Sequence, residues 1–146
     1  MNPNLVYLVQ TDTTAGFLSQ NAQALSKAKG RDPHMPFLMS VSSFAKQKGY
    51  VRTPKRFRKE VRRARKTTYL YPCKKAVRVV GEGKHHRFLK KFTFMYSTSA
   101  NAHGARFALS YALQKADVIV EDGAGFFEGA PSSIFRLGRR KKIALR

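Results

Sequence analysis

The chain has 146 residues, of which 29 are Lys or Arg and 8 are Asp or Glu, so its formal charge is +21. This length suits one domain, and 42% hydrophobic residues with 11 Phe can fill a core, which excludes wholesale disorder. No apolar run reaches the roughly 18 residues of a membrane span, and Met1–Asn4 lacks the features of a signal peptide. The single cysteine, Cys73, excludes an internal disulfide. We therefore expect a cytoplasmic single domain, residues 1–146, whose charge favours a polyanionic partner.

Short strands and helices alternate in the first third of the chain. An apolar strand is predicted at Leu5–Gln10, followed by a hydroxyl-rich turn at Thr11–Gly16. The next segment, Asn21–Lys29, reads as a helix that Gly30 ends. A buried strand is expected at Pro36–Val41, and Ser42 is expected to cap a brief helix.

The densest basic segment, residues 53–66, is predicted to be helical. Thr53 is a suitable N-cap, Pro54 suits the first helical position, and Phe57 and Val61 belong to one narrow apolar stripe. Cations surround that stripe, and like charges on one helix repel each other unless an anion binds them. The segment therefore favours contact with nucleic acid, whereas the alternative is a merely solvated face. The candidate RNA-binding residues are Arg56, Arg58, Lys59, Arg62, Arg63 and Arg65.

The second half continues the alternation and ends in a basic tail, residues 139–146. Strands are expected at 67–71, 76–80, 92–96, 117–121, 133–137 and 142–145, and helices at 84–91 and 106–114. The pattern predicts an α/β fold with a twisted mixed sheet. Adjacent His85 and His86 point to different sides of a helix, so no metal site is expected there. Cys73 is interpreted as a small buried residue.

Four polar segments are expected at the ends of predicted strands, where α/β sheets usually bind ligands. They offer hydroxyls, two cations one residue apart, an amide and backbone N–H groups near glycine. Such donors suit a triphosphate or a carboxylate. The segments are Thr11-Asp12-Thr13, Lys29-Gly30-Arg31, Ser97–Asn101 and Gly129–Ser133.

The order and spacing of these segments resemble the YrdC-like (YrdC/YciO) family of threonylcarbamoyl-adenylate synthases. Lys29-Gly30-Arg31 resembles the family's Lys-x-Arg motif, and Ser99 with Asn101 resembles its Ser-x-Asn motif. Residues 10–16 resemble the opening turn, and residues 129–134 resemble part of the closing segment. The resemblance covers most of the chain and implies a YrdC-like open α/β fold.

The resemblance implies an enzyme, a nucleotidyltransferase that condenses threonine, bicarbonate and ATP and releases pyrophosphate. Its product would pass to threonylcarbamoyl-transfer proteins that modify an adenosine of tRNA. The catalytic residues would be Lys29, Arg31, Ser99 and Asn101, which would also bind ATP together with Ser132 and Ser133. Thr11, Thr13 and Arg31 would bind threonine, and Mg²⁺ would bridge the phosphates through water and the phosphates themselves.

The sequence also departs from the family pattern. Gln10 stands where proline is usual, Ala15 where an aromatic residue is usual, and the basic helix replaces a Trp-Pro-Gly-Pro segment. These departures leave open an alternative, a catalytically reduced module of the same fold that binds tRNA or double-stranded RNA. A third possibility is carbamoyl transfer to another acceptor, because related domains occur in hydrogenase maturation proteins.

Overall fold

The computed structural model describes all residues, 1–146, and the chain forms two compact units. Unit 1 consists of Met1–Phe37 and Met95–Ala130, and unit 2 consists of Leu38–Phe94 and Pro131–Arg146. Each unit is built on strands of mixed direction with helices beside them, which confirms the predicted α/β class. None of the helices has the length and apolar composition that a bilayer-spanning helix needs.

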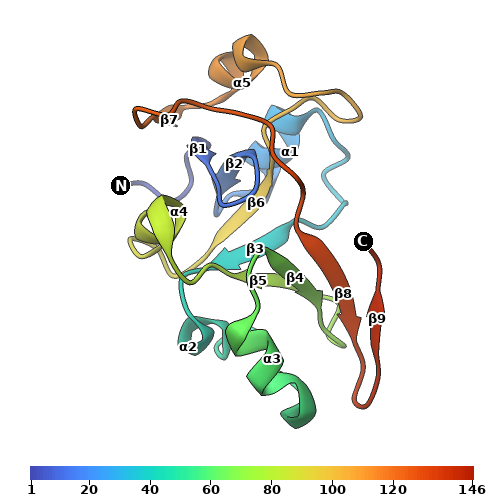
Figure 1. Cartoon of the computed structure of the whole chain (residues 1–146). Helices are drawn as coiled ribbons and strands as arrows, with labels where there is room; N and C mark the ends of the chain where they lie inside the picture. The colour runs from blue at the N-terminus through green and yellow to red at the C-terminus, as the bar shows by residue number, and fades with distance from the viewer. The chain divides into compact units, whose positions relative to one another are not determined.

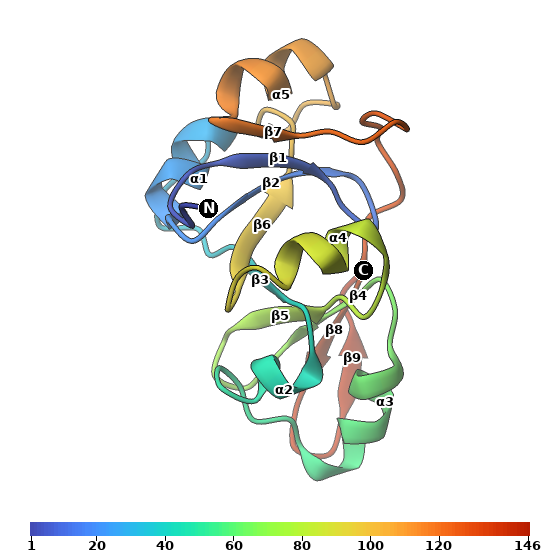
Figure 2. The same cartoon turned by 90° about the vertical axis from the view of Figure 1, so that its left-hand side faces the viewer.

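Unit 1 contains four strands in the order β7, β1, β2 and β6 (Figure 2). β1 pairs in parallel with β7 and antiparallel with β2, and β2 pairs antiparallel with β6. β2 is buried along its whole length, so this strand is central to the unit. The bounds are β1 Tyr7–Gln10, β2 Ala15–Ser19, β6 Met95–Ser99 and β7 Val118–Val120.

Two helices, α1 (Ala22–Lys29) and α5 (Leu109–Lys115), pack on these strands. The core joins Leu25 and Ala28 of α1 and Ala112 of α5 to buried residues of the sheet such as Leu8 and Phe17. Helix α1 therefore buries its apolar face in this cluster, whereas α5 contributes Ala112 to it and leaves Leu109 and Leu113 exposed.

Unit 2 contains five strands in the order β3, β5, β4, β8 and β9. The pairs β3–β5 and β4–β8 are parallel, whereas β4–β5 and β8–β9 are antiparallel. β8 and β9 form the C-terminal hairpin (Figure 1). The bounds are β3 Leu38–Val41, β4 Thr67–Leu70, β5 Ala76–Val79, β8 Ser133–Leu137 and β9 Lys142–Ala144.

The helices of unit 2 are short. They are α2 (Phe44–Gln47), the 3₁₀ turn η1 (Lys55–Phe57), α3 (Arg58–Arg63) and α4 (Gly83–Leu89). The predicted basic helix is therefore one 3₁₀ turn followed by six α-helical residues. Thr53 does not cap it, because the Thr53 hydroxyl is buried and accepts a hydrogen bond from Gln47 Nε2 at 2.8 Å. Ser43, rather than Ser42, caps α2.

Three further expectations were wrong. The predicted turn at Thr11–Gly16 includes Ala15 and Gly16, but these two residues begin the strand β2, Ala15–Ser19. The predicted strand at 92–96 lies three residues later, at Met95–Ser99, because Phe92 follows α4 and packs on Phe88 with ring centroids 5.2 Å apart. Cys73 is exposed, because it lies in the tight connection between β4 and β5.

Candidate anion-binding site in unit 1

The end of α1 positions Lys29. Asn21 begins the helix, its side-chain oxygen accepting the Ala24 N–H at 3.1 Å, and Gly30 ends it in the left-handed conformation with φ 66°. This conformation favours glycine because it lacks a Cβ. Lys29 is thus the last helical residue, only 5% exposed, with its side chain directed into the unit.

The end of β6 supplies the groups that meet this lysine. Pairing of β6 with β2 places Ser99 opposite Gly16, and the Ala100 N–H donates to Ala15 O at 2.9 Å. The Asn101 amide then donates to the carbonyl oxygens of Ala102 and Ala105, which fixes the orientation of its Oδ1. The Ser-x-Asn segment is therefore a rigid turn at the end of a central strand pair.

The Lys29 ammonium contacts this turn through three hydrogen bonds. Its Nζ donates to Ser99 O at 3.0 Å, to Ser99 Oγ at 2.9 Å and to Asn101 Oδ1 at 2.7 Å. An ammonium has three protons, so all three find acceptors within the protein. The two predicted motifs, Lys-x-Arg and Ser-x-Asn, are thereby brought together although Lys29 and Ser99 are 70 residues apart.

Burial and, to a smaller extent, the nearby positive charge of Arg31 together lower the pKa of the Lys29 ammonium to about 8. Desolvation is the larger cause, because burial disfavours the charged form of an amine. At neutral pH the amine still carries its proton in most molecules, by a ratio of about ten to one. Lys29 is therefore a cation whose charge is confined to a water-poor place, where it would act strongly on a bound anion.

Arg31 is held by the segment that follows α1. Its Nη2 donates to Pro36 O at 2.7 Å and to Met35 O at 3.2 Å, and its guanidinium carbon lies 4.1 Å from the centre of the Phe37 ring. Burial lowers the pKa of this guanidinium. Its Nε is buried and makes no hydrogen bond, so one strong donor is left for another group.

Thr11 and Thr13 shape the turn between β1 and β2. The Thr11 hydroxyl donates to Thr14 O at 2.6 Å and accepts the Thr13 and Thr14 N–H groups at 3.2 Å each. The Thr13 hydroxyl lies 3.2 Å from that of Thr11. Gly129 packs on this turn so closely that a Cβ at Gly129 would overlap Thr13 O. The predicted turn is therefore confirmed over residues 11–14, and the Thr11 hydroxyl stabilises its backbone.

Ser132 and Ser133 lie in unit 2. The Ser132 hydroxyl is 2.9 Å from that of Thr68 and accepts from Arg146 Nη2 at 3.3 Å, while its carbonyl accepts from Arg146 Nε at 2.9 Å. Ser133 is exposed and begins β8. Within unit 2, Ser132 is therefore a buried and fully engaged group.

The six candidate RNA-binding residues are all exposed, while Phe57 and Val61 are buried as the apolar stripe predicts. They fall into two groups of three. Arg58 donates to Thr53 O at 3.3 Å, Arg62 lies over the Phe44 ring at 5.0 Å, and Arg65 pairs with Glu82. The side chains of the other three, Arg56, Lys59 and Arg63, make no contact of this kind.

The structure shows positions for two polar residues whose roles the sequence did not predict. Gln10 anchors the segment after β7, because its Oε1 accepts the N–H of Phe127 at 2.9 Å. Arg78 is a buried cation, 3% exposed, in the middle of β5. The sequence offers two signals for these roles, a glutamine at the end of a strand and an arginine within an apolar strand. A polar side chain in such a place is costly to bury unless it has a partner.

Several solved structures share the fold of this chain. The P. abyssi Sua5 structure solved with L-threonine aligns with a TM-score of 0.79 and 17% identity, over 97% of this chain and 50% of that one. E. coli YciO aligns with a TM-score of 0.75 and 14% identity over 98% and 82% of the two chains. T. kodakarensis HypF aligns with a TM-score of 0.74 and 16% identity, over 98% of this chain and 22% of that one. These likenesses confirm the predicted fold.

The chain spans about half the length of the Sua5 chains it matches. No curated protein matches it in a sequence search. The family model for Sua5, YciO and YrdC, which carries the description "Telomere recombination", matches residues 6–146. This match covers nearly the whole chain, and the chain therefore belongs to the Sua5/YciO/YrdC family.

Proposed function

We propose that the chain is a threonylcarbamoyl-adenylate synthase-like enzyme that serves threonylcarbamoyladenosine modification of tRNA. It would condense threonine, bicarbonate and ATP and release pyrophosphate. The observation that carries the proposal is the direct contact of Lys29 with Ser99 and Asn101, because it unites the two motifs on which the activity would depend. A family member, P. abyssi Sua5, was solved with L-threonine, and we carry this substrate over to the present chain.

The proposed chemistry needs positioned cations and no covalent nucleophile. The amine of threonine and bicarbonate would form a carbamate with loss of water, and a carbamate oxygen would attack the α-phosphorus of ATP. The bond from that phosphorus to the pyrophosphate oxygen would break, and pyrophosphate would leave. Lys29 would stabilise the negative charge that develops, and Arg31 Nε would donate its free hydrogen bond to an anionic oxygen.

The remaining residues would have supporting roles. Ser99 and Asn101 would hold Lys29 and contact a phosphate or the carbamoyl group. Thr11 would act through the shape of its turn, with Thr13 on the threonine side. Ser132 and Ser133 belong to unit 2, and their part in ATP binding stays a prediction from the family resemblance. No three His, Cys, Asp or Glu residues gather in a metal-binding group. We propose that Mg²⁺ would be held by the phosphates and water, as this ion prefers.

The test is pyrophosphate release by the full chain with Mg²⁺. We expect release only when ATP, threonine and bicarbonate are all present, and strong loss of it in Lys29→Ala. Lys27→Ala is the matched control, because Lys27 is exposed on the same helix. Release that continues without threonine, or equal rates in the two variants, would contradict the proposal.

The charge of unit 2 favours a second candidate function, binding of tRNA or double-stranded RNA, with or without catalysis. Unit 2 holds 24 of the 29 Lys and Arg residues and only two of the eight acidic residues, a formal charge of +22. Unit 1, which contains Lys29, holds five basic and six acidic residues, a charge of −1. The catalytic proposal therefore leaves nearly all of the positive charge unexplained. Binding to tRNA that weakens steeply with salt would support this function, and binding without salt dependence would contradict it.

A further inference from the structure

The two acidic residues of unit 2 are Glu60 and Glu82. Glu82 pairs with Arg65 on the surface. Glu60, on α3, is more deeply engaged: its Oε1 accepts from Tyr69 Oη at 3.1 Å and from Lys142 Nζ at 2.8 Å. Lys142 lies on β9, so this carboxylate joins α3 to the C-terminal hairpin.

Aromatic packing strengthens the same connection. Lys142 Nζ lies 4.6 Å from the centre of the Phe135 ring on β8, and that ring stacks on Tyr69 of β4 at 6.0 Å. Burial and the bond with Glu60 raise the pKa of Tyr69, so its hydroxyl keeps its proton and its role as donor. The hairpin is thus held against α3 by a carboxylate, an ammonium and two rings.

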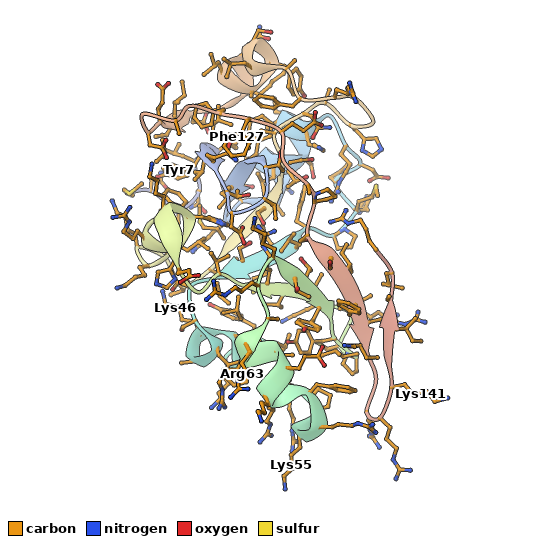
Figure 3. The ribbon with its side chains drawn as sticks, viewed as in Figure 1. Tyr7, Lys46, Lys55, Arg63, Phe127 and Lys141 are labelled. Atoms are coloured by element: carbon orange, nitrogen blue, oxygen red, sulfur yellow. The ribbon has the colours of Figure 1, made fainter.

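This connection gathers free cations from two distant parts of the sequence. Arg56, Lys59 and Arg63 are exposed on η1 and α3, and Arg139, Arg140 and Lys141 are exposed at the tip of the hairpin. None of the six side chains makes a hydrogen bond or an ion pair within the protein. Arg63 and Lys141, labelled in Figure 3, extend outward from their elements. We call these six residues the α3–hairpin face.

The chemistry of this face fits a phosphate backbone better than unpaired bases. Proteins that hold single strands stack the bases on exposed aromatic rings. Every Phe and Tyr of unit 2 is buried or half-buried, and the exposed large apolar residues there are Ile143 and Leu145. Cations without aromatic platforms are typical of contact with a duplex through shape and backbone.

We propose that the α3–hairpin face binds the phosphate backbone of a nucleic-acid duplex and that Glu60 is its positioning residue. The inference rests on the second candidate function and extends it, because it assigns half of the contacts to the hairpin tip. It also reduces the six candidates of the helical segment to Arg56, Lys59 and Arg63, since Arg58, Arg62 and Arg65 are engaged within the protein.

The test is fluorescence anisotropy of the full chain with a labelled RNA duplex at several salt concentrations. Three triple variants to Gln remove the same charge: the α3 set (Arg56, Lys59, Arg63), the tip set (Arg139, Arg140, Lys141) and an exposed control set in unit 2 (Lys75, Arg87, Lys90). We expect the first two to weaken binding roughly tenfold or more and to reduce the salt slope by about two to three, since each phosphate contact contributes about 0.9. The control set should retain most of the affinity.

The outcomes separate the inference from the function on which it rests. The tip variant could bind the duplex as well as the control variant while the α3 variant binds it weakly. That result would overturn the shared face and leave RNA binding by α3 intact. Equal losses of affinity in all three variants would mean that net charge alone attracts the duplex, and would overturn the proposed face. No duplex binding by the wild type would overturn the candidate function itself. Tighter binding to the single strand, or a tip-dependent preference for phosphatidylserine vesicles, would refute the choice of partner.

Glu60→Gln tests the positioning role. This change removes one negative charge and so raises the net charge of the protein by one. Attraction by net charge alone therefore predicts tighter binding. We expect weaker binding and a lower salt slope, because Lys142 and the tip lose their anchor. The effect should not add to that of the tip set, as expected for groups that act as a unit. Glu82→Gln is the matched control and should not weaken binding; a gain of affinity in Glu60→Gln would contradict the role.

Discussion

Replacement of Lys29 by methionine should change how stability depends on pH. The pKa of this ammonium is about 8 in the folded chain, against 10.5 for an ordinary lysine, chiefly because of burial. Between these two values the unfolded chain binds more protons than the folded one, so stability rises with pH. The stability that depends on Lys29 is fully present above pH 10.5, the pKa of the lysine in the unfolded chain. It is lost as the pH falls through about 8, the pKa in the folded chain.

The expected size follows from the same two values. A difference of one pKa unit corresponds to about 1.4 kcal/mol, so the whole contribution is about 3 kcal/mol. Between about pH 7 and about pH 10 the free energy of unfolding of the wild type should rise by roughly 2–3 kcal/mol relative to Lys29→Met. Because Lys29 is 5% exposed, solvent screening does little to reduce this value.

The assay is urea unfolding of the wild type, Lys29→Met and Lys27→Met across this pH range. The exposed Lys27 serves as control, and its variant should follow the wild type in parallel. The difference between wild type and Lys29→Met should instead change steadily with pH. Parallel curves for all three proteins would refute the claim that the Lys29 ammonium is desolvated in the fold.

Three other substitutions test the architecture of unit 1, each by denaturant unfolding. Asn101→Ala removes the 2.7 Å acceptor of a buried ammonium and should cost about 1.5–3 kcal/mol; a cost near zero would contradict this hydrogen bond. Gly129→Ala places a Cβ on Thr13 O and should destabilise the chain by at least about 1 kcal/mol, whereas Gly123→Ala meets no neighbour and should not. Asn21→Ala removes the cap of α1 and should cost about 1 kcal/mol, and an unchanged midpoint would argue against the cap.

Local signals in the sequence were sufficient to predict an element whose ends are set by residues within it or next to it. Helix α1 follows from Asn21 at its start and Gly30 at its end, and both act through backbone hydrogen bonds within a few residues. Strand β2 escaped prediction because Gly16 and the preceding hydroxyls are typical of turns. It is a strand because β1 and β6 pair with its two edges, which no local pattern records.

The candidate site shows the same division. The alternation of Phe92 and Phe94 indicated a strand that the structure places three residues later, because pairing of Gly16 with Ser99 sets the register. The contact of Lys29 with Ser99 depends on that register and could not follow from periodicity. Family resemblance supplied the two motifs, and the structure adds their hydrogen bonds. The basic segment was recognised from composition, but the link from Glu60 to Lys142 needs three dimensions.

The most direct test of the proposed activity is mass spectrometry of the product formed from ATP, threonine and ¹³C-bicarbonate. The account predicts an adenylate that contains threonine, that forms only when all three substrates are present, and that gains the mass of one neutron from the labelled carbon. The wild type and Lys27→Ala should form it, and Lys29→Ala should form little. An adenylate without the label, or ATP breakdown that is indifferent to threonine, would contradict the account.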